Sequence, residues 1–337
     1  MQHRNQFAYA ALAALFAVST SAWAASPLTL ERTIQLVGVR GKFDHFAIDA
    51  SGNRLFAAAA AAHEVLAIDL NSAKIAQTLT GFGKPHGIVW DAEDGRLFVT
   101  DGVKGELNVF AGTPLAPVAT IKLAEDADDM AYDNRQHLLY IGNGGTNAAN
   151  PPSVAIVDTK TLKLVKKLPA ASHPEGLDID SQHGRIFANI ADSAQVLVID
   201  SNRNEIAQTW PLSGTKDNTP LAYDAVDNLL LVACRKPARL LVIDAQTGKQ
   251  IASAKADADA DDLFFDPSTH RAFVVAGAGK VDSYVVAKYG KLTELPVTET
   301  APGAKTGLLV ASHETLYVGV PGTPDGDSIR VYRYSVK

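Results

Sequence analysis

The stretch IVWDAEDGRLFVT, residues 88–100, holds two short apolar strands on either side of a polar turn. Turn-forming Asp and Gly between two apolar runs are typical of a β-hairpin. The first strand, with its terminal aspartate, recurs along the chain. Successive terminal aspartates are separated by 42, 42, 47, 44 and 42 residues: Asp49, Asp91, Asp133, Asp180, Asp224 and Asp266. A seventh, degenerate copy occupies residues 307–311.

Each copy is followed by further strands. A second strand such as Arg96–Val99 comes after the turn, then a third such as Val196–Asp200 and a weaker fourth such as Glu205–Trp210. Four short strands per unit of about 44 residues indicate a β-propeller, because each unit buries its apolar face only against its neighbours. The sequence therefore predicts an all-β, seven-bladed propeller of four-stranded blades. One domain would span residues 25–337, with blades starting near 43, 85, 128, 174, 219, 261 and 305.

The two ends of the repeat array complement one another. The seventh unit supplies three strands and lacks a fourth, whereas Thr33–Val37 lies before the first unit and has no place in it. We expect this N-terminal strand to complete the last blade and close the ring, since closure removes an exposed sheet edge.

The N-terminus has the features of a secretory signal peptide. Arg4 precedes an apolar run from Phe7 to Val18, and Ala22-Trp23-Ala24 is a small-residue cleavage site. The run is shorter than the roughly 20 residues that span a membrane. Residues 1–24 are therefore expected to be cleaved on export to the periplasm. No later run approaches spanning length, so no membrane span is expected in the mature chain.

Several cofactor and partner classes lack a motif here. Cys234 is the only cysteine, so neither an intrachain disulfide nor a C-x-x-C-H haem attachment site can form. No Gly-rich phosphate loop is present, which argues against a bound nucleotide. The net charge of −6 argues against nucleic acid as the main partner. A small-molecule ligand or a periplasmic protein is the expected partner.

The repeat units resemble the YVTN family of β-propellers. Arg96–Gly102 is close to the family's second strand and following loop, and Leu139–Asn143 is a looser match. Val196–Asp200 and Leu240–Asp244 look like its third strand. The resemblance covers essentially the mature chain and implies the propeller fold. Propellers of this kind include binding modules, lactone hydrolases, lyases and redox-enzyme subunits, so the fold leaves the function open.

The residues just before each inner strand converge at one mouth of the channel in a propeller. They are Asp44-His45, Pro85-His86, Asp128-Asp129, Pro174-Glu175, Thr219-Pro220, Asp261-Asp262 and Lys305-Thr306. Imidazoles with carboxylates suit a divalent transition metal, and carboxylates alone suit calcium. We therefore predict one divalent ion, a transition metal rather than calcium, on His45, His86 and Glu175 with Asp129 or Asp262. The alternative is a structural ring that bonds neighbouring backbones or stays solvated.

Other residues on the same face are candidates for binding a ligand. Arg235 and Arg239 follow the second strand of the fifth unit and could hold an anionic group. Asn143 opens the long loop 142–153, and His63 and His173 flank the ring. A salt-bridged surface loop is the alternative for the arginines.

Three functions remain compatible with the sequence. The first is a binding or scaffold propeller that presents a ligand, metal or partner site at the channel mouth. The second is a metal-dependent hydrolase or lyase, lactonase-like, that uses the His and carboxylate ring. The third is a subunit of a redox enzyme that relies on a partner chain for its cofactor. The sequence favours the first, followed by the second.

Overall fold

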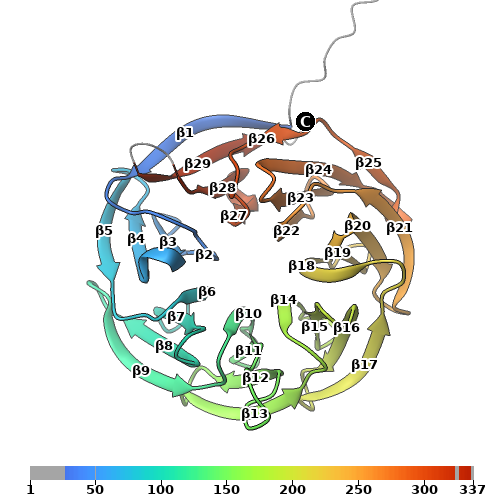
Figure 1. Ribbon diagram of the computed structural model, residues 1–337, viewed down its shortest axis with the longest axis horizontal. Coiled ribbons are helices and arrows are strands. Elements are labelled where there is room, and N and C mark those ends of the chain that lie inside the picture. The colour runs from blue at the N-terminus through green and yellow to red at the C-terminus, as the bar shows by residue number, and fades with distance from the viewer. Residues whose placement is uncertain (1–26, 50, 323–325, 335–337) are drawn as a thin grey trace, which may run out of the picture.

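A computed structural model describes residues 27–49, 51–322 and 326–334, and these form seven antiparallel sheets arranged in a ring (Figure 1). The propeller prediction is therefore confirmed. The first blade has β2 (Phe46–Ile48), β3 (Arg54–Ala59), β4 (Glu64–Asp69) and β5 (Lys74–Leu79). The second has β6 (Pro85–Asp91), β7 (Arg96–Asp101), β8 (Glu106–Ala111) and β9 (Ala116–Lys122). The third has β10 (Ala127–Asp133), β11 (Leu138–Asn143), β12 (Ser153–Asp158) and β13 (Lys163–Pro169).

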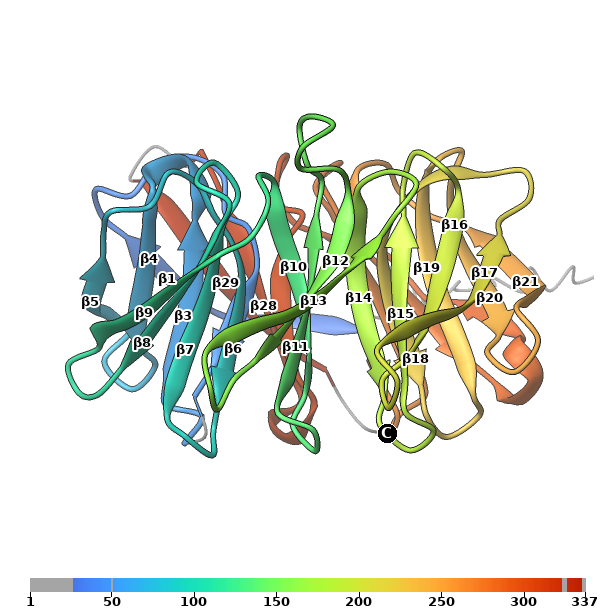
Figure 2. The ribbon, with the colours of Figure 1, turned by 90° about the horizontal axis from the view of Figure 1, so that it is seen from below.

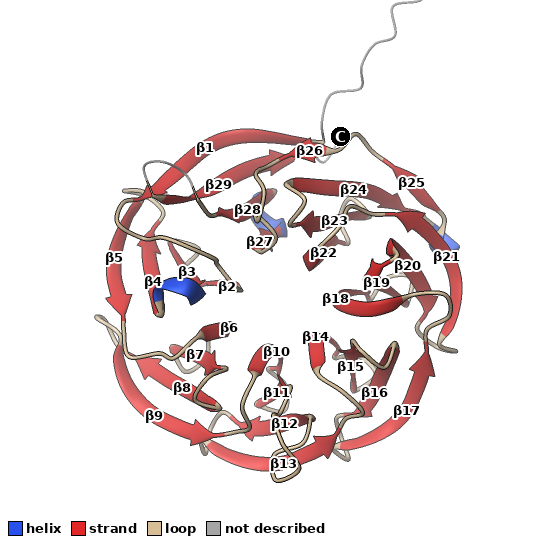
Figure 3. Cartoon of the chain, viewed as in Figure 1, coloured by secondary structure: helices blue, strands red, loops and turns tan. Residues whose placement is uncertain are grey.

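The later blades repeat this order from the channel outward. The fourth has β14 (Pro174–Asp180), β15 (Arg185–Ile190), β16 (Gln195–Asp200) and β17 (Glu205–Pro211). The fifth has β18 (Lys216–Asp224), β19 (Leu229–Lys236), β20 (Ala238–Asp244) and β21 (Lys249–Lys255). The sixth has β22 (Ala260–Asp266), β23 (Arg271–Ala276), β24 (Lys280–Val286) and β25 (Leu292–Glu294), with β26 (Thr298–Glu299) also on β24. Three short 3₁₀ turns complete the described elements (Figure 3): η1 (Ala60–Ala62), η2 (Lys288–Gly290) and η3 (Ala311–His313).

The last blade joins the two ends of the chain. It has β27 (Gly307–Val310), β28 (Thr315–Val320), β29 (Asp327–Tyr334) and, outermost, β1 (Leu28–Leu36). Strand β1 pairs antiparallel with β29, from Leu28 opposite Tyr334 to Leu36 opposite Asp327. Closure by an N-terminal strand is confirmed. The strand starts earlier than Thr33, and it ends before Val37, which is 80% exposed in the following turn.

Apolar side chains fill the space between neighbouring blades. Phe98 of the second blade and Leu139 of the third are both fully buried in one such cluster, together with Met130 of the inner strand β10. Burying a side chain of this size stabilises the fold by roughly 1.5–3 kcal/mol. Because every blade is clamped on both sides in this way, the inner strands form a fixed frame around the channel.

The repeated terminal aspartates accept hydrogen bonds from the turns that follow them, as predicted. Asp49 accepts hydrogen bonds from the Asn53 N–H at 3.0 Å and from Arg54 Nε at 2.9 Å. Asp91 accepts one from the Glu93 N–H at 3.1 Å. These carboxylates lie at the far end of the inner strands from the channel mouth. Figure 2 shows the loop between β11 and β12 standing out from the opposite face, where the inner strands begin.

The export signal predicted for residues 1–24 lies outside the described residues. Within the described ranges, no helix is long and apolar enough to cross a membrane.

Candidate metal centre

The inner strands begin at the channel mouth, and an irregularity at the start of five of the seven directs polar side chains inward. The pairing between β6 and β7 shifts register between Pro85 and Ile88, and that between β10 and β11 shifts between Ala127 and Met130. The same shift occurs at the starts of β14, β18 and β22. A bulge of this kind re-aims side chains that a regular strand would alternate. It brings residues from different blades to one place.

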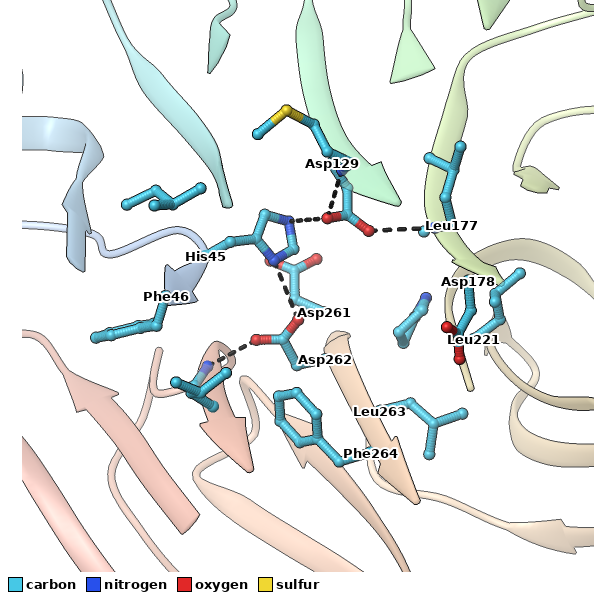
Figure 4. Close-up of a pocket in the computed structure, with 16 residues that line it drawn as sticks. His45, Phe46, Asp129, Leu177, Asp178, Leu221, Asp261, Asp262, Leu263 and Phe264 are labelled. Carbon is cyan, nitrogen blue, oxygen red and sulfur yellow. Dashed lines mark hydrogen bonds and ion pairs between the residues drawn. The ribbon is translucent and has the colours of Figure 1, made fainter. Parts of the chain in front are cut away.

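His45 reaches across the channel from the first blade. Its Nδ1 lies 3.2 Å from Asp262 Oδ1 of the sixth blade, and its Nε2 lies 4.0 Å from Asp129 Oδ1 of the third. Figure 4 shows the ring between these two carboxylates. Nε2 is also 3.4 Å from Asp44 Oδ1. Burial lowers the pKa of His45, but the three carboxylates outweigh burial and raise it well above the usual value.

Asp129 and Asp262 also bind the backbone of the following blade. Asp129 Oδ2 accepts a hydrogen bond from the Leu177 N–H at 3.1 Å, and Asp262 Oδ2 accepts one from the Gly307 N–H at 2.6 Å. Burial raises the pKa of Asp129 to about 6. The alternative role, in which a carboxylate bonds backbone, therefore holds for one oxygen of Asp262, whose other oxygen faces His45. It holds for both oxygens of Asp129, because Asp129 Oδ1 also accepts a hydrogen bond from the Met130 N–H at 2.7 Å.

His86 lies between two further carboxylates. Its Nδ1 is 3.0 Å from Asp44 Oδ2 and 3.0 Å from Asp128 Oδ1. The residue is only 4% exposed, yet neither ring nitrogen has a well-formed hydrogen bond to any described residue. Burial lowers its pKa, but Asp128 and Asp44 raise it to about 10. In turn His86 holds the pKa of Asp128 below its usual value, against the effect of burial.

Donor atoms of Asp44, His45 and Asp128 all lie within 4.8 Å of one another. His86 lies beside this group, with Nδ1 next to one oxygen of each of the two carboxylates. This set of nitrogen and oxygen donors suits Zn, Mn, Fe or Ni.

A second group of donors adjoins the first and shares Asp128. His173 Nδ1 lies 3.4 Å from Glu175 Oε1 and 3.4 Å from Asp126 Oδ2. His173 Nε2 lies 3.8 Å from Asp128 Oδ2. Burial lowers the pKa of His173, but Glu175, Asp128 and Asp126 raise it to about 9.

The opposite side of the mouth carries positive charge. Lys305 Nζ lies 2.6 Å from Asp261 Oδ2, and Arg235 Nη2 pairs with the same carboxylate. Arg235 Nε also donates a hydrogen bond to the Ala260 carbonyl at 3.0 Å. Burial raises the pKa of Asp261 to about 6 in spite of these two cations.

Two cavities meet at His45. The outer one, about 190 Å³, is lined by the polar groups of the mouth, including Lys84, Arg235 and Lys305. The inner one, about 250 Å³, shares His45 and Asp129 with it. Its other walls combine three carboxylates, Asp178, Asp261 and Asp262, with apolar side chains: Phe46, Ile88, Met130, Leu177, Leu221, Leu263, Phe264 and Leu308.

The structure brings some of the predicted site residues to this mouth and places others elsewhere. His45, His86, Asp129, Asp262 and Arg235 lie there in the contacts just described. Glu175 lines the outer cavity, but its ion pair is with His173 rather than with His45 or His86.

Three predicted ligand-binding residues have other partners. Arg239 donates a hydrogen bond to Ser253 Oγ at 2.8 Å on the outer strands. Asn143 is fully buried, and its amide donates to the Ile141 carbonyl at 2.8 Å. His63 lies on the face, with Nδ1 2.5 Å from the Gly83 carbonyl oxygen.

The predicted ligand set omits several acidic residues that the structure places in the channel, among them Asp44, Asp128, Asp178 and Asp261. Asp44 and Asp128 directly precede His45 and Asp129, and the inner-strand alignment already contained them. Asp178 lines the inner cavity, and burial raises its pKa to about 6. The sequence could have identified Asp178, because it is an acidic residue at a repeat position that holds Ala, Val or Phe in other units: Ala47, Val89, Ala131, Ala222 and Phe264.

Residues 51–210 match the Cytochrome D1 heme domain family, which is less than half of the 337-residue chain. The match runs from the first blade to the fourth. The channel does not fit a haem as it stands. Both cavities are below the roughly 300–1,000 Å³ of pockets that hold drug-sized ligands, and His45 crosses between them.

No curated protein matches the chain. Among solved structures, Kuenenia stuttgartiensis hydrazine synthase superposes with a TM-score of 0.76 at 13% identity, covering 90% of this chain and 97% of that chain. A chain of the mitotic checkpoint complex superposes with a TM-score of 0.76 at 14% identity, covering 99% of each. At such low identity the two likenesses establish the propeller fold alone, and the resemblance to the YVTN family stays a prediction.

Proposed function

We propose that this chain is a periplasmic binding propeller whose channel mouth holds a divalent transition metal on Asp44, His45, His86 and Asp128. The observation that carries the proposal is His86. It is 4% exposed, its Nδ1 faces two carboxylates at 3.0 Å, and neither ring nitrogen has a well-formed hydrogen bond within the described chain. A buried polar group without a hydrogen bond is costly, and a bound cation removes that cost.

The separations between donors support a shared ion. Metal–ligand bonds of about 2.0–2.1 Å place neighbouring donors about 3.0–3.4 Å apart in octahedral or tetrahedral sites. The His86 nitrogen is 3.0 Å from an oxygen of each carboxylate, and the His45 nitrogen is 3.4 Å from Asp44. Simple packing of side chains does not require these three separations to match those of ligands on one ion.

The charges at the mouth also favour a cation. Without an ion, protonated histidines offset the carboxylates, as the raised pKa of His86 indicates. A metal ion displaces those protons, because the ligand is neutral imidazole. Two imidazoles favour a transition metal over calcium. Lys84, Arg235 and Lys305 face the same cavity, so an anionic ligand or a partner's acidic group could approach the ion there.

The test is metal retention by the mature protein. After exposure to Zn, Mn, Ni and Ca in turn and extensive dialysis, elemental analysis should find a transition metal bound. His45→Ala with His86→Ala should abolish binding at this site. Gly102→Ala keeps every donor, but its methyl group would lie 2.8 Å from His86 Nε2. We expect that variant to bind roughly 10-fold or more weakly, as for other changes that disturb a ligand's support.

Gly83→Ala is the matched control. Its methyl group would approach the exposed Val103 side chain instead, and affinity should not change. Retention of calcium alone, unaffected by the histidine changes, would contradict the proposal. So would the absence of any retained metal.

The inner cavity favours a second candidate function, a metal-dependent hydrolase or lyase. A small substrate with both polar groups and an apolar part fits a space of about 250 Å³ that is lined by apolar side chains and by His45 and Asp129. Hydrolysis of lactones by the metal-loaded protein, lost on chelation and in His45→Ala, would support this function. Inactivity of the metal-loaded protein towards a panel of lactones and esters would leave the binding function.

A further inference from the structure

We infer that the channel mouth holds a second divalent ion beside the first, on Asp126, His173 and Glu175, with Asp128 as a carboxylate bridge between the two ions. The inference extends the proposed function, because it shares Asp128 with that site. The remaining three donors are separate from it.

The second group has the same donor spacing as the first. His173 Nδ1 is 3.4 Å from both Glu175 Oε1 and Asp126 Oδ2. Donor atoms of Asp128, His173 and Glu175 all lie within 4.8 Å of one another. An imidazole with three carboxylates is a donor set for Mn, Fe or Zn.

Asp128 is placed as a bridging ligand would be. Its Oδ1 lies 3.0 Å from His86 and its Oδ2 lies 3.8 Å from His173 Nε2, so its two oxygens face different imidazoles. Two-metal sites hold their ions about 3.5–4 Å apart, which one carboxylate can span. Asp128 comes from β10, between the blades that carry His86 and His173.

Asp128 lies between two enclosed imidazoles. His86 Nδ1 is 3.0 Å from Asp128 Oδ1 and His173 Nε2 is 3.8 Å from Asp128 Oδ2, and neither contact has hydrogen-bond geometry. An ion on each side of Asp128 would bind these donors directly.

The positive side chains across the mouth have other partners. Arg235 and Lys305 both pair with Asp261 and Asp259. On the side of Asp126 and Glu175, the ion pairs that the structure shows are with His173. A second cation would balance the three carboxylates there.

Manganese loading tests the second ion in the full mature chain. We expect two equivalents of Mn per chain after dialysis, and an electron paramagnetic resonance spectrum of an exchange-coupled pair. His173→Ala should retain one equivalent and give the spectrum of an isolated ion. Glu175→Gln, a milder change, should lower retention of the second equivalent, and thermal unfolding would verify that both variants fold. His183→Ala, on the far face, should retain both.

Each other outcome overturns the inference. One equivalent in both the wild type and His173→Ala would leave the first site in place and remove the second. One equivalent that survives His45→Ala with His86→Ala but is lost in His173→Ala would place a single ion at the second group and reject the first. Two equivalents without magnetic coupling would reject the Asp128 bridge. No retained metal would reject both sites.

Discussion

The carboxylates that line the channel divide their oxygens between two kinds of partner. Asp262 uses one oxygen for the Gly307 N–H of the next blade and turns the other towards His45. Asp129 accepts from the Leu177 N–H with one oxygen and from the Met130 N–H with the other, which is 4.0 Å from His45. Asp178 uses both oxygens for backbone, accepting from the Tyr223 N–H and the Ile179 N–H, each at 2.7 Å. The same residue type therefore has a structural or a site role depending on whether an oxygen is left facing the channel.

Asp178 provides a pH prediction at the scale of one residue. Burial raises its pKa to about 6, whereas an unfolded aspartate titrates near 3.9. The folded state therefore binds a proton on Asp178 more tightly than the unfolded state does. The stability that this bound proton contributes at low pH is lost as pH rises through about 6. Asparagine does not titrate. We compare the free energy of unfolding of Asp178→Asn with that of wild type at each pH. The difference, variant minus wild type, should be about 1 kcal/mol larger at pH 7.5 than at pH 5, after allowance for solvent screening.

Urea unfolding of metal-free protein at the two pH values measures this difference. Titration of the other mouth residues affects variant and wild type alike, so it cancels in the difference between them. The lost hydrogen bond affects the variant alike at both pH values, so it cancels when the two pH values are compared. An equal stability difference at both pH values would show that Asp178 does not titrate in this range.

At the scale of an element, β1 shows how one strand closes the ring. Its inward residues Leu28, Ile34 and Leu36 are at most 3% exposed, and Ile34 and Leu36 pack in a cluster with residues of the first blade. Leu30 on the same strand is 50% exposed. The strand therefore seals the junction between the last blade and the first, beside the segment that leads to Asp44 and His45.

Substitution within β1 tests that junction. Leu36→Ala should lower the free energy of unfolding by about 2–5 kcal/mol, because it removes buried methyl groups and leaves a cavity. Leu30→Ala, the matched control, should cost less than about 1 kcal/mol. Chemical denaturation of both variants provides the comparison. Equal small losses would mean that the strand is dispensable for closure.

At the scale of the whole molecule, the ring gathers seven blade ends into one small volume. The blades that supply His45, His86, Asp128 and His173 are consecutive, and Asp262 comes from across the channel. Arg235 and Lys305 lie among the remaining blades. The mouth is therefore divided into an imidazole and carboxylate side, where we place the ions, and a side with paired cations.

Export determines whether this mouth meets periplasmic metal and ligands. The segment with Arg4, the apolar run and Ala22-Trp23-Ala24 predicts cleavage before Ala25. Intact-mass measurement of protein from the periplasmic fraction should give a chain that begins near Ala25. A chain that still carries residues 1–24, or one confined to the cytoplasm, would contradict the prediction.

The fold could be predicted from the sequence because its causes are local. Alternation of apolar residues, turns with Asp and Gly, and a repeat of about 44 residues recur in each unit, and the missing fourth strand pointed to closure by the N-terminus. The residues before the inner strands were also identified as the candidate site, since every blade begins at the same face.

The partners within that site depended on tertiary structure. Asp128 and Asp129 are neighbours in sequence, but the bulge at the start of β10 turns one towards His86 and the other towards His45. Glu175 pairs with His173, and Arg239 turns to an outer strand while Arg235 faces the mouth. Periodicity determines which blade end a residue occupies. Contacts across the channel are set by side-chain direction and blade packing, over sequence separations that no local pattern encodes.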